Sequence, residues 1–482
     1  MAFAPERYRE IVDDWPAFLE AVRRPLPLTV RVNRLRAVAG RGAAPVREWL
    51  EAEGLRVRPV PWDGDLLRLE PRPDGPAEPP APGRLLATLG GLVHVQEEVS
   101  LLPVRLLAPR PGERVLDLCA APGSKAGALA AAMAGRGTLV ANDVDWRRLS
   151  SLGRNLERLG ALNAVVTCYD AANFPFAAGC FDRVLADVPC TCEGTSRKNP
   201  EVFTWGDPAS RSETARVQGA VLRKAVRLVR PGGRVVYSTC TYAPEENEAV
   251  VDAVLAAARR AGRPLRVLDA RVDGFPAAAG LREWRGERFD PALERALRVW
   301  PHHHDTGGFF VAVLEREGTR ETSPADVAEP ELPATVEPGP WLGPVRERFG
   351  LPEEVFAGTG LVQRGRGVLA LVADDLRAPR HPRPSSVGVG LLHAGMRNPK
   401  LTTAGAMAVG PAATRNVVDL DAEELRAYIA RRDQELPAGR ADACTGGYVL
   451  VRHRGACFGV GWLRPAPAGG RASLRSLFPK RW

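Results

Sequence analysis

Apolar and polar residues follow two different periods along the middle of the chain. Short, nearly continuous apolar runs predict buried strands, and the stretches between them, such as Ala126–Ala134 and Trp146–Leu159, have the three-to-four-residue period of helices. The predicted strands are Arg114–Leu118, Thr138–Asp143, Ala164–Cys168, Arg183–Asp187, Arg234–Thr239 and Gly308–Leu314. Buried strands that alternate with helices are typical of a mostly parallel, doubly wound α/β sheet.

The flanking segments have other patterns. Residues 1–85 contain the alternating run Leu28–Ala37 and end in a Pro-rich connector, so we expect an N-terminal extension there, which we predict to bind RNA. The α/β pattern fills residues 86–318. Residues 319–340 are rich in Pro, Glu and Thr, which predicts a linker, and residues 341–482 form a further α/β region. Two alternating runs on either side of Gly455 predict a β-hairpin near its end.

The charge balance favours a nucleic-acid partner. The net charge of this 482-residue chain is +9, and only five of its 66 basic residues are lysines. The planar guanidinium of arginine suits phosphate, although heavy use of Arg, Ala, Gly and Pro is equally expected of a GC-rich genome. The eight cysteines include no CxxC pair, and neither a signal peptide nor a membrane-spanning run is visible. These features predict a cytoplasmic protein with reduced thiols and no metal site.

A glycine-containing turn, VLDLCAAPGSK, follows the first predicted strand. Such a turn lets backbone N–H groups and a helix N-terminus approach a nucleotide-like ligand. Lys125 would lie near a carboxylate of that ligand. Asp143 ends the next strand, where it could accept bonds from both ribose hydroxyls, and Asp170 after the third strand could meet an adenine amine. The spacing is not GxGxxG, and any Rossmann-like protein with a tight first turn is the alternative.

Two cysteines lie at the predicted carboxyl ends of strands, where open α/β sheets bind their ligands. They are Cys190 in DVPCTCEG and Cys240 in YSTCTYAPEEN, and Asp187 stands three residues before the first. Carbon 5 of cytosine becomes nucleophilic only after a nucleophile has added to carbon 6, and a thiolate does this well. The parts therefore indicate cytosine 5-methylation, in which a second thiol can assist release. The alternative for each cysteine is simple burial, which we expect for the other thiols.

Six motifs in order resemble the Nop/Sun family of RNA cytosine-5 methyltransferases. They are GLVHVQEEVSLLPV, CAAPGSK, ANDVDWRR, DVPCTCEGTSRKNP, YSTCTYAPEENE and RVWPHHHDTGGFFVA. The resemblance implies a class I, Rossmann-like methyltransferase fold with S-adenosylmethionine as cofactor. It also implies that Cys240 is the nucleophile and Cys190 the release residue. The cofactor-binding residues that it implies are Cys119, Ala120, Ala121, Pro122, Gly123, Ser124, Lys125, Asp143, Arg148, Asp170 and Asp187.

This sequence departs from the family at DVPCTCEG, where a DAPCSGEG-like string is more frequent. Val188 is bulkier than alanine, and Cys192 replaces a glycine that could adopt a left-handed conformation. The family has no thiol at that position, so Cys192 is not expected to be the nucleophile. The basic pair Arg197 and Lys198 lies a few residues further on and is expected to bind an RNA phosphate. The alternative is that both side chains are solvated surface residues.

The ends of the chain resemble the bacterial ribosomal RNA small-subunit methyltransferase F group. The matching strings are RVNRLRA near the start and GYVLVRHRG, FGVGWL and SLFPKRW near the end. This implies a C-terminal PUA-like RNA-binding module and 16S ribosomal RNA as substrate, with the protein acting as a monomer. A tRNA substrate, a DNA methyltransferase and a non-catalytic ribosome-assembly protein are the alternatives. The adjacent His302, His303 and His304 are not expected to bind a metal.

Overall fold

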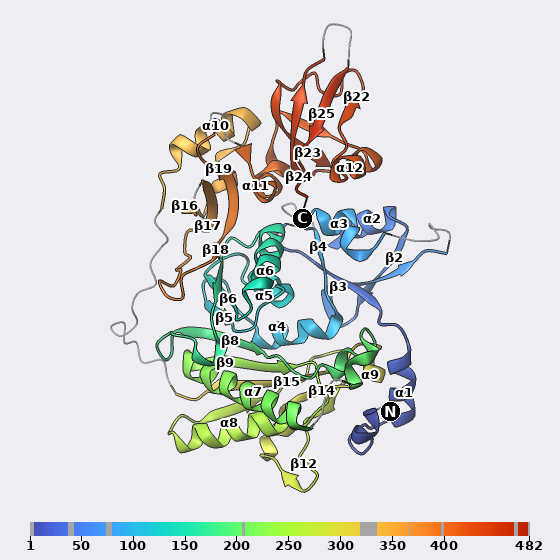
Figure 1. Ribbon diagram of the computed structural model, residues 1–482, viewed down its shortest axis with the longest axis vertical. Helices are drawn as coiled ribbons and strands as arrows, with labels where there is room; N and C mark the ends of the chain where they lie inside the picture. Colours follow the sequence, from blue (N-terminus) through green and yellow to red (C-terminus); the bar gives the residue numbers. More distant parts are fainter. Residues whose placement is uncertain are drawn as a thin grey trace.

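The computed structural model describes residues 4–36, 43–73, 80–204, 208–318, 335–365, 367–396, 400–466 and 471–480. A large α/β sheet fills the lower half of the molecule, the N-terminal region lies along one side of it, and the C-terminal region lies above both (Figure 1). Most of the predicted linker, residues 319–334, and residues 74–79 of the Pro-rich connector lie outside the described residues.

The centre of the molecule is a parallel sheet of five strands in the order β9-β8-β5-β6-β7. Their bounds are β5 Arg114–Asp117, β6 Thr138–Asp143, β7 Ala164–Cys168, β8 Phe181–Asp187 and β9 Val229–Thr239. The chain passes from β5 outward to β7 and then returns to the other side of β5. The strand order therefore reverses between β5 and β8, and in open α/β sheets a ligand binds at the carboxyl ends of the strands beside such a reversal.

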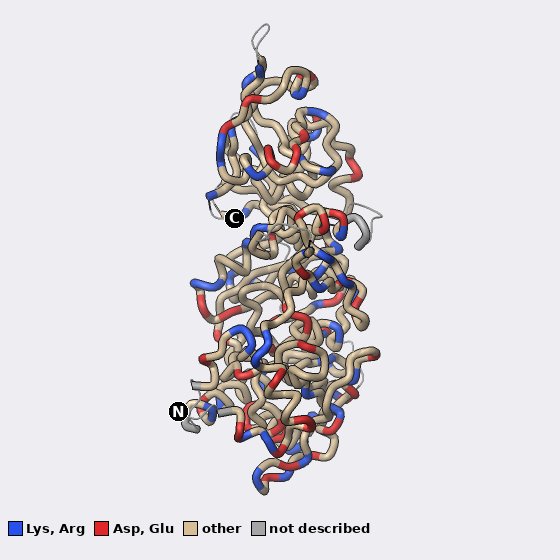
Figure 2. Tube along the Cα trace, turned by 90° about the vertical axis from the view of Figure 1, so that its right-hand side faces the viewer, with Lys and Arg blue, Asp and Glu red and all other residues tan. Residues whose placement is uncertain are grey.

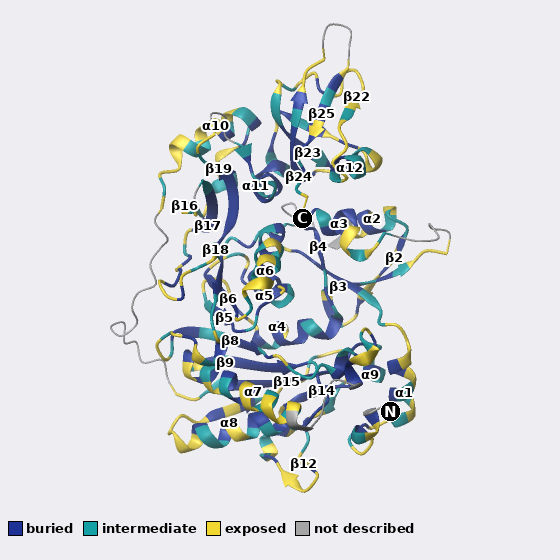
Figure 3. Cartoon of the chain, viewed as in Figure 1, coloured by how far each residue is buried: buried dark blue, intermediate teal, exposed yellow. Residues whose placement is uncertain are grey.

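Helices cover both faces of this sheet, so the predicted doubly wound class is confirmed. The helices α4 (Leu102–Leu107), α5 (Ser124–Ala132) and α6 (Trp146–Leu159) share one apolar core with the strands. On the other face α7 (Pro208–Leu228) and α8 (Glu248–Arg260) share a second core. The central strands are almost entirely buried between the two layers (Figure 3), which explains their unbroken apolar runs.

Antiparallel strands extend both edges of the sheet. Beside β9 lie β15 (Phe309–Arg316), β14 (Leu297–Val299) and β11 (Ala278–Ala279), and β10 (Leu265–Leu268) also pairs with β15. Beside β7 lies β18 (Ser386–Val387), which comes from the C-terminal region. A small hairpin, β12 (Glu283–Trp284) and β13 (Glu287–Arg288), and the short helix α9 (Pro301–His304) lie between these strands in sequence.

The N-terminal region forms a four-stranded antiparallel sheet in the order β2-β3-β1-β4. Its strands are β1 Leu28–Val32, β2 Leu55–Val60, β3 Asp63–Pro71 and β4 Val93–Val95, and its helices are α1 Trp15–Arg23, α2 Ala43–Ala52 and α3 Leu86–Leu89. Because β4 pairs with β1, this sheet continues across the predicted boundary at residue 85. The start of α1 packs against Tyr242 and Trp300 of the α/β part through Phe18.

The C-terminal region holds two further sheets. One has the order β16-β17-β19-β20 and the other β21-β23-β24-β25-β22. The strands are β16 Thr359–Arg364, β17 Val368–Ala373, β19 Val389–His393, β20 Lys400–Leu401, β21 Val417–Asp419, β22 Gln434–Leu436, β23 Gly447–His453, β24 Ala456–Arg464 and β25 Ala472–Ser476; the helices are α10 Gly339–Phe349, α11 Thr403–Val409 and α12 Ala422–Ile429. The predicted hairpin at Gly455 is confirmed, since β23 and β24 pair across it.

The second of these sheets and the N-terminal sheet share one apolar core. Trp49 of α2 stacks against Phe458 of β24 with ring centroids 6.0 Å apart, and it meets the His453 ring edge-on. Arg426 of α12 forms an ion pair with the largely buried Glu53. The residues from the two ends of the chain thus complete one folding unit, although more than 300 residues separate them.

Candidate active site

The predicted cofactor turn lies between β5 and α5. Gly123 precedes the first residue of α5 and has φ +108°, a left-handed conformation that favours glycine. A Cβ there would lie 3.1 Å from Leu152 Cδ1 of the neighbouring α6. The glycine therefore lets the turn pass close to α6 and leaves the N-terminus of α5 open to a ligand.

Asp143 at the end of β6 is held against this turn. Its carboxylate accepts hydrogen bonds from Ala121 N at 3.1 Å and Asp145 N at 3.0 Å, and Arg148 Nη1 lies 3.5 Å from it. Arg148 also donates to the Ala121 carbonyl. Asp170, at the end of β7, is exposed and accepts a bond from Ala172 N. The structure thus places all the predicted acids at neighbouring strand ends.

Asp117 is a further acid at this edge that the sequence analysis did not identify. It ends β5, is 1% exposed, and neither carboxylate oxygen has a hydrogen-bond partner among the described residues. Burial and the nearby charge of Asp187 raise the pKa of Asp117 to about 8. A buried carboxyl without partners suits a cationic group of a ligand. The sequence feature that could have identified Asp117 is a single acidic residue inside the apolar run VLDL.

Lys125 and Asp187 form an ion pair across the reversal point of the sheet. Lys125 Nζ lies 2.7 Å from Asp187 Oδ2, and Ser238 Oγ donates to Asp187 Oδ1 at 2.7 Å. Burial alone would lower the pKa of Lys125, but Asp187 reverses this and raises it. Lys125 therefore stays charged, and its ion pair with Asp187 fixes that carboxylate at the end of β8, beside the predicted catalytic thiols.

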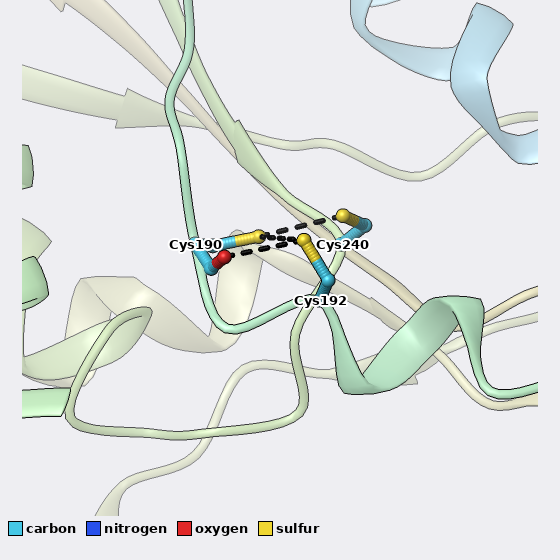
Figure 4. Close-up of side chains that lie close together, drawn as sticks. All are labelled: Cys190, Cys192 and Cys240. Carbon is cyan, nitrogen blue, oxygen red and sulfur yellow. Dashed lines mark hydrogen bonds between the residues drawn. The ribbon is translucent and has the colours of Figure 1, made fainter. Parts of the chain in front are cut away.

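The structure brings three thiols together rather than two (Figure 4). Cys190 and Cys192 lie on the loop after β8, and Cys240 follows β9. Cys190 Sγ is 3.4 Å from Cys240 Sγ and 3.9 Å from Cys192 Sγ. All three side chains are half-buried. The predicted pair at the carboxyl ends of adjacent strands is thus close enough to share one pyrimidine ring, and a third sulfur lies beside it.

The thiol loop is held by buried polar groups. Thr191 N donates to Glu246 Oε2 at 3.1 Å, and Gln218 Nε2 donates both to that carboxylate at 2.8 Å and to the Pro189 carbonyl at 2.9 Å. Glu193 is buried and accepts a bond from the Tyr8 hydroxyl of the N-terminal region at 3.0 Å. Sequence reasoning did not assign these roles, because they depend on contacts between distant segments.

Cys192 adopts the conformation expected of the glycine that it replaces. Its φ is +63° and its ψ is 17°, in the left-handed region. A non-glycine residue there costs on the order of 1 kcal/mol. The larger side chain of Val188 is accommodated in the apolar core that α7 covers, where it is buried. The loop therefore has, at Cys192, the left-handed conformation that glycine adopts without strain.

The three thiols share their protons unequally. Hydrogen bonds from Cys190 and Cys240 lower the pKa of Cys192. Hydrogen bonds with Cys192 and Cys240, together with burial, raise the pKa of Cys190. A hydrogen bond from Cys190 favours the Cys240 thiolate, but the bond to Cys192 and burial leave the pKa of Cys240 raised. A thiolate at Cys192 is thus stabilised by the other two S–H groups.

The predicted RNA contacts lie in different environments. Arg197 is buried, and its guanidinium donates to the carbonyls of Arg24, Pro25 and Thr306 and to Asp305. Those bonds tie α1 to the α/β part and leave the side chain little capacity for a phosphate. Lys198 is exposed.

The histidine run meets an acid of the N-terminal region. His302 Nε2 and His303 Nε2 lie 3.0 and 2.9 Å from the two carboxylate oxygens of Asp13. In the described part of the chain, two groups of three or more His, Cys, Asp or Glu residues have all their potential metal-ligand atoms within 4.8 Å of one another. One is this group of Asp13, His302 and His303, and the other is the three thiols. The hydrogen bonds to Asp13 attach α9 to the N-terminal region.

A buried histidine, His94, forms a hydrogen bond with the residue that follows the cofactor turn. His94 Nε2 lies 2.9 Å from Ser124 Oγ, and its Nδ1 lies 2.9 Å from Arg158 Nη2. Burial and nearby Arg158 lower the pKa of His94 to about 3, so the ring is neutral. Because arginine can only donate, Nδ1 accepts and the ring proton is on Nε2, which donates to Ser124. The motif GLVHVQEE thus has a structural role beside the turn.

Known proteins match this chain over most of its length. The sequence model of a family described as "16S rRNA methyltransferase RsmB/F" matches residues 104–315. A ribosomal RNA small subunit methyltransferase F from Aeromonas salmonicida is 33% identical over 463 residues, covering 92% of this chain and 89% of its own. A tRNA (cytosine(49)-C(5))-methyltransferase from Pyrococcus abyssi is 32% identical over 316 residues, covering 64% of this chain and 94% of its own.

Solved structures show the same fold. The crystal structure of a methyltransferase homolog from Pyrococcus horikoshii is 30% identical and superimposes with a TM-score of 0.54, covering 65% of this chain and 94% of that one. The predicted Rossmann-like methyltransferase fold and the resemblance are thereby confirmed. Among the described residues, no helix combines the length and apolar character needed to cross a membrane.

Proposed function

The chain belongs to the RsmB/F family of RNA cytosine-C5 methyltransferases, and on that premise we propose that it methylates carbon 5 of a cytosine in 16S ribosomal RNA. The observation that carries the proposal is the 3.4 Å separation of Cys190 and Cys240 beside the Lys125–Asp187 pair. A substrate of this kind is found in the cytoplasm, and we expect the protein to act there.

The residues of the cofactor turn fit S-adenosylmethionine. The cofactor has cationic sulfonium and ammonium groups, and Asp117 offers a buried carboxyl without partners at the end of β5. Asp143 and Asp170 offer acceptors for the ribose and the adenine amine. When bound, S-adenosylmethionine supplies the methyl group.

The catalytic roles follow from the positions of the thiols. Cys240 releases its proton to solvent, and the resulting thiolate adds to carbon 6 of the cytosine, which makes carbon 5 nucleophilic. Asp187, held by Lys125 and Ser238, holds the nitrogen edge of the ring by accepting a hydrogen bond from its amino group, which orients the ring for addition. After methylation the carbon 5 proton leaves, the bond from Cys240 to carbon 6 breaks, and Cys190 assists this release by proton transfer.

The length of the similarity favours ribosomal RNA over tRNA. The Aeromonas relative named for small-subunit RNA matches this chain through its C-terminal region, whereas the archaeal tRNA enzyme is almost fully covered by 64% of this chain. We propose that the C-terminal region, including its PUA-like part, contributes RNA contacts. Lys and Arg are spread along the whole molecule among Asp and Glu (Figure 2), so charge alone does not mark the path of the RNA.

Methyl transfer from tritiated S-adenosylmethionine tests the proposal. We expect label to enter 16S RNA, free or within the small subunit, in preference to tRNA. Sequencing of modified cytosines from a strain that lacks the protein should then show one or more unmodified positions in 16S RNA. Labelling of tRNA alone would assign the enzyme to the other substrate, and absence of labelling in every RNA would support a ribosome-assembly role.

Removal of the Asp143 carboxylate should weaken cofactor binding. Asp143→Ala loses the acceptors expected to bind the ribose hydroxyls, so affinity for S-adenosylmethionine should fall by about 1.5–3 kcal/mol, the range for hydrogen bonds to charged groups. Calorimetry on the folded variant measures this. Asp145→Ala, which removes the N-cap of α6 two residues away, controls for local loosening. Equal affinities for the wild type and Asp143→Ala would reject the assignment.

Lys198→Ala should weaken RNA binding in a salt-dependent way. If the exposed ammonium neutralises one RNA phosphate, its removal lowers the slope of log affinity against log salt by about 0.7–0.9. Filter binding at several salt concentrations measures the slope. Arg260→Ala, at the end of α8 and at the opposite edge of the sheet from the thiols, is the matched control. If both variants change the slope equally, Lys198 has no special role in binding phosphate.

A further inference from the structure

Three sulfur atoms from two segments of the chain converge beside the proposed site of attack. Cys190 and Cys192 come from one loop and Cys240 from the end of β9, and their side chains point toward one another (Figure 4). All three Sγ atoms lie within 4.8 Å of one another. The proposed reaction uses two of these thiols, so Cys192 has no role in it.

The sulfur separations match those around a thiolate-bound metal ion. A Zn–S bond of about 2.3 Å in tetrahedral geometry places neighbouring sulfurs ~3.8 Å apart. Cys190 Sγ lies 3.9 Å from Cys192 Sγ and 3.4 Å from Cys240 Sγ. Small side-chain rotations would therefore let all three sulfurs contact one ion. Three soft donors with no oxygen ligand favour Zn²⁺ or Cd²⁺ over Mg²⁺ and Ca²⁺.

The third donor, Cys192, lies in the turn that leads from Cys190 into the short helical turn Glu193–Thr195. Cys192 keeps the left-handed backbone that glycine would adopt, with φ +63°. Its sulfur is thereby directed back over the loop, 3.2 Å from the Cys190 carbonyl oxygen. The charge of Lys125 interacts favourably with a Cys240 thiolate and that of Asp187 unfavourably, so the bound cation itself would balance the negative charge of the thiolates.

We propose that Cys190, Cys192 and Cys240 bind one soft divalent cation, and that the bound ion switches methyl transfer off. Binding releases to solvent the protons that the three sulfurs still carry and forms three metal–sulfur bonds, with no change in oxidation state. The inhibitory part rests on the proposed function: the lone pair that Cys240 would donate to carbon 6 of cytosine is donated to the metal instead.

Metal binding is measured on the full-length protein without RNA. Cd²⁺ is added under a non-thiol reductant, which prevents disulfides, and thiolate-to-metal charge-transfer absorption is followed in the ultraviolet. We expect one equivalent of Cd²⁺ to bind with a charge-transfer band. Cys192→Gly, which suits the backbone at that position, should lose the band, and Cys192→Ser should lose it too. Cys444→Ser, a half-buried thiol in the C-terminal region, should keep it.

Methyl transfer is measured separately, with and without Zn²⁺, and each variant is compared with itself. Zn²⁺ should inhibit the wild type and Cys444→Ser, a chelator should restore both, and Cys192→Gly should resist inhibition. A band of equal strength in Cys192→Gly, or no stoichiometric band in the wild type, would overturn the inference. If the protein binds Cd²⁺ as expected but the metal-free enzyme transfers no methyl group to any RNA, the proposed function is rejected. The proposal that the three thiols bind a metal ion would still stand.

Discussion

Cys240→Ala should abolish methyl transfer and form no covalent complex with RNA, whereas Cys190→Ala should accumulate one. If Cys240 attacks carbon 6, its loss removes the first step. Loss of Cys190 leaves attack and methylation possible but stalls release, so the enzyme stays bound to its product. Denaturing electrophoresis with labelled RNA would show the adduct as a slowly migrating band. The adduct should form only with enzyme that can still bind S-adenosylmethionine.

A double variant, with both Cys190→Ala and Cys240→Ala, and the single variant Asp187→Ala complete the test. The double variant should form no adduct, because neither of the two thiols remains to attack carbon 6. Asp187→Ala should lose activity, since the carboxylate that holds the nitrogen edge of the ring is gone. The reverse pattern, with the adduct trapped by Cys240→Ala and absent in Cys190→Ala, would assign attack to the proline–cysteine, as in DNA cytosine methyltransferases. Retained activity in both single variants would make both thiols structural.

Arg298→Met should destabilise the protein by about 3–5 kcal/mol, the cost of leaving a buried charge without its partner. Arg298 of β14 donates to both oxygens of Glu248 at the start of α8, and the two side chains are only 3% and 0% exposed. Arg298 also donates to the Tyr242 carbonyl at 3.0 Å, two residues after Cys240. Urea denaturation followed by tryptophan fluorescence should show a lower midpoint.

An exposed pair of the same chemistry is the control for this variant. Arg282 and Glu294 form a two-pronged ion pair, but their side chains are 70% and 42% exposed. Arg282→Met should therefore change stability by no more than about 1 kcal/mol. Equal losses in the two arginine variants would mean that burial of the Arg298–Glu248 pair does not govern its contribution.

The central sheet could be predicted from the sequence because its information is local. Strands buried on both faces need unbroken apolar runs, and β6 and β7 have the predicted bounds. The edge strands carry a weaker signal. For β18 only two residues pair with β7, and they are more than 200 positions away in sequence, so no local pattern marks them as part of this sheet.

The same distinction holds for the site. Asp143, Asp187, Cys190 and Cys240 were predicted because parallel strands carry the residues at their carboxyl ends to one edge. Two findings depend on tertiary contacts instead. The guanidinium of Arg197 is bonded to distant carbonyls, and the sulfur of Cys192 lies within 4.8 Å of that of Cys240, which follows another strand. Neither contact has a signature in the spacing of residues.

The core shared by the two ends of the chain has a consequence for synthesis on the ribosome. The N-terminal sheet is synthesised before the α/β part, but part of its apolar face packs against residues 418–478, which are translated more than 300 residues later. Until then Trp49 and its neighbours lack their final partners and are exposed to chaperones or to other nascent chains. A chain that stalls before β24 would therefore leave this core without Phe458 and its neighbours, and the N-terminal unit would stay incomplete.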